Sequence, residues 1–159
     1  MKILGHRHTG IIVHDFNKML DFYIGLGLEL RRRDIEKGAF VGHLLNTENI
    51  ILETAKLVLQ DESVPLKLRF NLELMKIVDN ETASNSDRYE VDKFDFNQRQ
   101  IGILDLAFTV DDITSVLKYI TDNGGDLISE PLESPAGFPA LHSYARDPEG
   151  NVLHIAQNI

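Results

Sequence analysis

The sequence has no cysteine and no tryptophan, and it has no long hydrophobic run. The absence of cysteine excludes disulfide bonds, thiolate zinc sites and cysteine nucleophiles. No apolar stretch approaches the roughly 18 residues that a membrane-spanning helix needs. Residues 1–10 lack the apolar core of a signal peptide. We therefore expect a cytoplasmic protein that has no membrane partner.

Basic residues are in the minority, because 16 Lys and Arg face 25 Asp and Glu, a formal net charge of −9. An acidic surface argues against nucleic acid as a partner. No glycine-rich phosphate loop and no serine-hydrolase elbow is present. The remaining composition is that of an ordinary globular protein, with 43% hydrophobic residues in a chain of 159. We expect a small-molecule substrate.

The most informative feature is an internal repeat of strand, helix and three further strands. Apolar alternation and helical spacing predict these elements in the first copy at 8–13, 16–26, 28–34, 51–59 and 67–77, and in the second at 105–110, 113–120, 126–129, 141–146 and 152–156. Asp15 and Asp112 are suited to cap the two helices. The first copy also has a short extra helix near Phe40 and Leu45.

The repeat predicts an α+β protein of two tandem βαβββ modules, residues 1–78 and 101–159. Segment 79–100 between them is polar and long for a compact protein. The segment is equally compatible with a mobile tether and with a functional element, which would be a lid or a strap that crosses a neighbouring molecule.

A turn between the last two predicted strands sets their register. The residues Asp147-Pro148-Glu149-Gly150-Asn151 are typical of a hairpin turn. With this turn, residue 154 opposes residue 144, so His142 and Tyr144 face the same side as His154. A shift by one residue would reverse this arrangement.

Several stretches resemble a known superfamily. They are HTGIIV at 8–13, FY before GLGL at 22–28, LEL at 72–74, LAFTVDDI at 106–113 and DPEGN at 147–151. In their order and repetition they resemble the vicinal oxygen chelate superfamily, which includes glyoxalase I, methylmalonyl-CoA epimerase, extradiol dioxygenases and bleomycin resistance proteins. The resemblance implies curved mixed sheets around a shared cavity.

The same resemblance implies a metal site with one ligand from the first and last strand of each module. By position these are His8 and Glu73, then Asp105 and His154. The superfamily has His and Glu at the last two positions, so this chain departs from the pattern there. The exchange keeps two imidazoles and two carboxylates, and strand alternation puts Asp105 and His154 on the less apolar side.

Such a donor set suits a divalent ion, Ni²⁺, Zn²⁺, Co²⁺, Mn²⁺ or Fe²⁺. The alternative is a metal-free pocket in which the same side chains form a polar wall, since Asp105 is one methylene shorter than Glu.

The superfamily's chemistry implies a metal-dependent lyase or isomerase that moves a proton next to a metal-bound carbonyl. Glu73 would act as ligand and base, with His142, Tyr144 and Glu53 as further catalytic candidates. A solvated strand edge is the other interpretation of Glu53. Two alternatives are an Fe²⁺ dioxygenase, with iron on His8, His154 and Glu73 or Asp105, and a non-catalytic antibiotic-binding protein. A homodimer is expected, because sheet faces and edges need cover.

Overall fold

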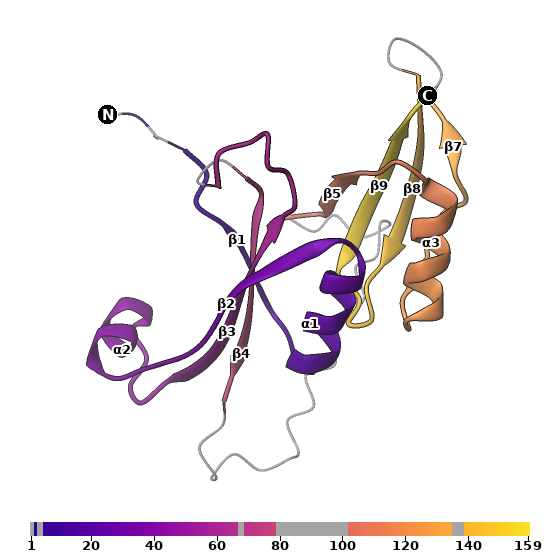
Figure 1. Ribbon diagram of the computed structural model, residues 1–159. Coiled ribbons are helices and arrows are strands. Elements are labelled where there is room, and N and C mark those ends of the chain that lie inside the picture. Colours follow the sequence, from indigo (N-terminus) through magenta and orange to yellow (C-terminus); the bar gives the residue numbers. More distant parts are fainter. Residues whose placement is uncertain (1, 3–4, 67–68, 79–101, 135–138) are drawn as a thin grey trace. The chain divides into compact units, whose positions relative to one another are not determined.

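The structure is a computed structural model that describes residues 2, 5–66, 69–78, 102–134 and 139–159 (Figure 1). The chain divides into two compact units, Met1–Arg88 and Tyr89–Ile159. The segment predicted as a tether or lid, 79–100, lies outside the described residues. Within the described residues, no helix is long and apolar enough to cross a membrane.

The first unit is a four-stranded mixed sheet with one long helix and one short helix. Its elements are β1 (Thr9–Ile12), α1 (Phe16–Gly25), β2 (Leu28–Lys37), α2 (Ala39–Leu45), β3 (Ile51–Leu59) and β4 (Asn71–Ile77). The strand order is β1-β4-β3-β2. Strand β1 runs parallel to β4, and the other neighbours are antiparallel. The first and last strands of this unit are therefore adjacent.

Helix α1 packs on one face of this sheet, where the core of the unit lies. Asp15 caps the helix by accepting a hydrogen bond from the Lys18 backbone N–H at 3.1 Å. Leu57 on β3 and its cross-strand partner Leu72 on β4 are fully buried on the helix side. Strand alternation turns the neighbouring residues of each strand to the opposite face.

The second unit repeats this topology. Its elements are β5 (Leu106–Thr109), α3 (Ile113–Asp122), β6 (Asp126–Leu127), β7 (Leu132–Glu133), β8 (Ala140–Arg146) and β9 (Val152–Asn158). The strand order is β5-β9-β8-β6, with β7 also on β8, and β5 is parallel to β9. Two mixed sheets with the same βαβββ order confirm the predicted α+β class. The short strand β7 was not predicted.

Helix α3 covers one face of the second sheet. Asp112 caps it, and the Ile113 backbone N–H donates to the Gln157 side chain on β9 at 2.8 Å. After the helix, the chain passes so close to the sheet that a Cβ on Gly125 would lie 2.3 Å from the Arg146 carbonyl oxygen. Glycine is therefore required there by the close approach of two backbones.

Candidate functional site

In the first unit, the polar side chains gather on the sheet face opposite α1. The register aligns Gly10, Glu73, Lys56 and Arg32 across β1, β4, β3 and β2. Glu73 lies between two buried leucines of β4, and its side chain leaves the sheet on the other side. The parallel pairing of β1 with β4 brings His8, just before β1, beside Glu73.

Glu73 has two cationic or potentially cationic neighbours. Its Oε2 lies 3.2 Å from Nε2 of His8, and its Oε1 lies 3.4 Å from Nζ of Lys56. The Glu73 side chain is only 7% exposed. A buried carboxylate is costly unless it is paired. His8 and Lys56 together supply that pairing.

The separation of His8 and Glu73 also suits a divalent metal. Two ligand atoms at about 2.1 Å from one ion, at right angles, lie about 3.0 Å apart. The observed 3.2 Å between imidazole nitrogen and carboxylate oxygen is close to this value. Among the described residues, no group of three or more His, Cys, Asp or Glu side chains could hold a metal ion. The first unit therefore provides a pair of suitable donors.

Asn71 adds a polar group on the same face, two residues before Glu73. Its Oδ1 is buried, and no hydrogen-bond donor in the described part of the chain reaches it. A buried acceptor without a donor is uncommon in a folded protein. It is an available contact for an N–H or O–H group of a ligand.

In the second unit, the register of the β8–β9 hairpin agrees with the prediction. Tyr144 pairs with His154, and His142 pairs with Ala156. The turn is held by Asp147, which is 2% exposed. Its carboxylate accepts from the backbone N–H groups of Glu149 and Asn151, at 3.0 and 2.9 Å, and from the Asn151 side chain at 2.8 Å.

This register brings four of the predicted residues together on the face opposite α3. Nδ1 of His142 lies 3.0 Å from Nε2 of His154. The Tyr144 ring stacks on the His154 ring with centroids 4.7 Å apart. Burial raises the pKa of the Tyr144 hydroxyl, and so do the charge of Asp105 and its hydrogen bond with that hydroxyl.

Glu53 lies apart from these groups. It shares the α1 face of the first sheet with Arg33, whose Nη2 is 2.5 Å from the Glu53 carboxylate. Arg33 also donates to Asn17 and covers the Phe16 ring at 5.0 Å. Since Glu53 and Glu73 occupy opposite faces, we leave Glu53 out of the proposed catalytic set.

The structure thus brings the predicted residues together in two groups, one in each unit, and leaves Glu53 outside both. Lys56 and Asn71 were missed at the sequence level. A signal for Lys56 was available, since it is a lone cation in the apolar strand ILETAKLVL. What could not be read was its pairing with Glu73, which depends on the register of β3 on β4.

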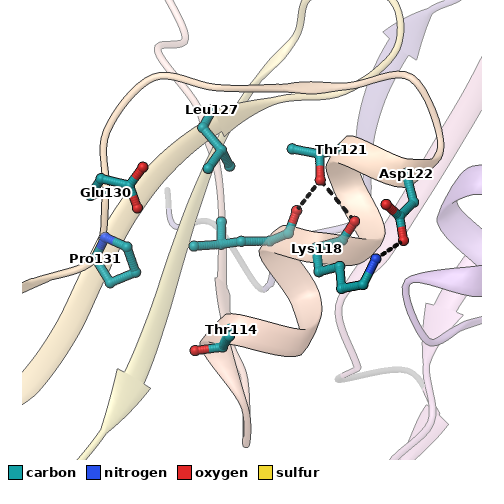
Figure 2. A pocket seen from close by; sticks show the side chains of 8 residues that line it. Thr114, Lys118, Thr121, Asp122, Leu127, Glu130 and Pro131 are labelled. Carbon is teal, nitrogen blue, oxygen red and sulfur yellow. Dashed lines mark hydrogen bonds and ion pairs between the residues drawn. The ribbon is translucent and has the colours of Figure 1, made fainter.

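A surface pocket of about 410 Å³ lies elsewhere in the second unit, between α3 and residues 127–131 (Figure 2). Lys118 on its rim is already paired with Asp122 at 2.6 Å, and the Thr121 hydroxyl donates to helix carbonyl groups. The pocket contains none of the predicted site residues. The polar groups of Lys118, Thr121 and Asp122 are therefore partnered within the helix.

The fold and the two polar groups define a protein built from tandem βαβββ modules with metal-ligand-type side chains on its sheets. The family profile described as Glyoxalase/Bleomycin resistance protein/Dioxygenase superfamily matches residues 7–141. The chain belongs to this superfamily, which confirms the resemblance found in the sequence.

A curated relative supports the same assignment. The chain is 27% identical over 157 residues to a probable lactoylglutathione lyase from Synechocystis sp.. The match covers 94% of this chain and 92% of the relative.

Solved structures share the fold. A glyoxalase family protein from Bacillus cereus matches with a TM-score of 0.77 at 23% identity, covering 100% of this chain and 97% of that one. A glyoxalase I mutant from Zea mays matches with a TM-score of 0.58 at 21% identity, covering 96% of this chain. The chain spans 44% of the maize protein.

Proposed function

We propose that this protein is a metal-dependent lyase or isomerase that moves a proton next to the carbonyl of a small oxygenated substrate. The observation that carries the proposal is the buried Glu73 carboxylate, which lies 3.2 Å from His8 on the sheet face opposite α1 in a member of this superfamily. The end-to-end match to a probable lactoylglutathione lyase supports a thiol adduct of a 2-oxoaldehyde as the substrate.

Each unit carries its own proposed metal-ligand residues, which are His8 and Glu73 in the first unit and His154 in the second. Neutral imidazole and carboxylate are good ligands for Zn²⁺, Ni²⁺, Co²⁺, Mn²⁺ or Fe²⁺. Asp105 is the fourth ligand that the superfamily pattern implies, and its carboxylate is hydrogen-bonded to Tyr144. A divalent ion bound there would polarise the substrate carbonyl and stabilise negative charge on its oxygen.

Glu73 is the proposed base. Its carboxylate would take the proton from the carbon beside the carbonyl and return it to the neighbouring carbon. Lys56 lies 3.4 Å from Oε1 of Glu73 and keeps that oxygen oriented on the sheet face. The free acceptor of Asn71 would receive a hydrogen bond from a substrate hydroxyl or amide group. These roles require the substrate to lie over β4 and β3.

The proposal is tested first by metal content. The protein, purified without chelators and assayed by elemental analysis, should contain near-stoichiometric metal that is lost in His8→Ala and in His154→Ala. His43→Ala is the matched control, because His43 is exposed on α2 away from Glu73. The hemithioacetal of glutathione and methylglyoxal is the first substrate to test, followed by ultraviolet absorbance of the thioester product.

Each result selects one interpretation. Metal lost in both variants, together with thioester formation that depends on Glu73, supports the lyase. Iron with oxygen uptake would replace it with the dioxygenase, for which Tyr144 beside His154 would be the acid–base partner. Absence of metal after each of the five ions has been added would refute the mechanism. The site would then be a polar binding pocket.

A further inference from the structure

Two cations extend the row that begins at Glu73 on the sheet face opposite α1. We propose that Lys56 and Arg32 form a subsite for an anionic group of the substrate, a carboxylate or a phosphate. The inference deepens the proposed function and rests on it for one point, that the bound anion belongs to the molecule whose proton Glu73 removes. Binding of the anion itself is measured without turnover.

The strand register places these two side chains next to each other. Arg32 on β2 is the cross-strand partner of Lys56 on β3, and Lys56 is the partner of Glu73 on β4. Directly opposed residues of an antiparallel pair share a face, with Cβ atoms about 5 Å apart. Like charges in this position repel each other. A ligand anion held between the two cations would offset that repulsion.

Both side chains keep N–H groups for a ligand. The ion pair of Arg32 with Asp34 uses Nε, and no ion pair or hydrogen bond within the described residues uses its two terminal nitrogens. Nζ of Lys56 lies 3.4 Å from one oxygen of Glu73, although an ammonium group has three N–H donors. The side chains of Arg32 and Lys56 are 68% and 35% exposed, so a solute can reach them. A guanidinium fork beside an ammonium group suits a carboxylate or a phosphate.

The competing interpretation is that each cation only neutralises a carboxylate of the sheet. Arg33 has that role, because its Nε and Nη2 both bind Glu53 and its Nη2 also donates to Asn17. Arg32 differs, because it lies on the Glu73 face and its terminal nitrogens contact no acceptor in the described part of the chain. The two interpretations therefore differ in whether an added anion binds at Arg32.

The register also sets where the anion would lie. Neighbouring strands are about 4.8 Å apart, so a group held between β2 and β3 lies about 7 Å from β4 along the sheet. The substrate would therefore carry its negative charge about 7 Å from the carbon that loses its proton to Glu73. Because Glu73 already pairs with Lys56, it competes with the anion for that ammonium group. Removing the charge of Glu73 should tighten anion binding.

The experiment compares two unreactive ligands of nearly equal shape, the anion methylthiopropionate and the neutral alcohol methylthiopropanol. NMR titration of the full chain gives both dissociation constants. The anion should bind about tenfold more tightly than the alcohol. Lys56→Met and Arg32→Met should each weaken the anion about fivefold and leave the alcohol unchanged. Glu73→Gln should tighten the anion about threefold, which a purely structural role of Lys56 would not produce.

Lys76→Met is the matched control, because Lys76 lies on β4 with its side chain on the α1 face, opposite Glu53 in the register. It removes the same charge from the same sheet and should leave the affinity for the anion unchanged. Equal weakening by Lys76→Met, or equal affinity for the anion and the alcohol, overturns the subsite. Circular dichroism verifies that each variant is folded. If Lys56→Met does not fold, the exposed Arg32→Met decides.

Turnover separates this inference from the proposed function. The two substrates are the hemithioacetals of methylglyoxal with mercaptopropionate and with mercaptopropanol, each added to the metal-loaded protein. Thioester formation from both at equal KM, unchanged by Arg32→Met, overturns the subsite and leaves the proposed function standing. No thioester from either, with the expected binding pattern intact, overturns the proposed function and leaves Lys56 and Arg32 as an anion-binding pair.

Discussion

Removing the Asp147 carboxylate should destabilise the second unit more than any surface substitution, because this side chain closes the β8–β9 turn from a buried position. Asp147 is 2% exposed and accepts three hydrogen bonds, two of them from backbone N–H groups. Asp147→Ala leaves those donors without their acceptor. The same turn sets the register that places Tyr144 opposite His154.

The magnitude follows from the three bonds. A hydrogen bond to a charged group contributes about 1.5 kcal/mol, and a buried donor left unsatisfied costs about 1 kcal/mol or more. Water entering the turn offsets part of the loss, so we expect Asp147→Ala to cost about 3 kcal/mol. A loss of this size lowers the Tm by roughly 10 °C in a chain of this length. Asp147→Asn keeps one oxygen acceptor and should cost about 1–2 kcal/mol.

Urea unfolding followed by circular dichroism measures these costs. Asp122→Ala is the control, because its pair with Lys118 is exposed, and exposed pairs contribute at most about 0.5 kcal/mol. A cost below about 1 kcal/mol for Asp147→Ala would refute the reasoning. It would mean that the turn forms without its carboxylate.

Three further predictions concern single side chains. Glu53→Gln should lower the free energy of unfolding in urea by about 1 kcal/mol, because its partner Arg33 is half exposed. The variant should keep its metal, and loss of metal would contradict a purely structural role for Glu53. Lys56→Met should bind metal about three- to tenfold more tightly in calorimetric titration, because its ammonium group competes for Glu73; weaker binding would give Lys56 another role. The hydroxyl and the backbone N–H of Ser115 donate hydrogen bonds to the Asp112 carboxylate and lower its pKa below the ordinary value of 3.8. The stabilisation that Asp112 provides is therefore present above pH 3.8 and is lost as the pH falls through the pKa of the folded state. The Tm deficit of Asp112→Asn should therefore shrink on acidification, whereas a deficit that stays constant with pH would contradict this.

Most of the fold could be predicted from the sequence because its signals are local. The Asp caps, the helical spacing and the Asp147–Asn151 turn each act within a few residues. Repetition of the same order of elements then identified the βαβββ modules and the superfamily. The last strand of the first module was predicted to begin at residue 67. The structure begins β4 at Asn71, so the described residues 69 and 70 lie outside the strand, whereas residues 67 and 68 lie outside the described part of the chain. Strand ends depend on which neighbour they pair with.

The candidate site was predictable only in part. The hairpin turn predicted that His142, Tyr144 and His154 share a face, and the observed register of β8 on β9 confirms this. The contact of His142 with His154 could not be foreseen, because it depends on side-chain orientation across two strands. The placement of Glu53 also required the sheet, since its partner Arg33 comes from a different strand.

The sequence by itself determined the two modules, their helix caps, the hairpin register and the residue types suited to a metal. Only the tertiary structure decided which of these residues meet. Glu73 lies beside His8 and Lys56 because β4 pairs with both β1 and β3. Residues 8 and 73 are far apart in the chain, so no local pattern in the sequence predicts their contact. Local patterns set which face a side chain takes, but contacts between distant strands are set by packing, which only the folded chain satisfies as a whole.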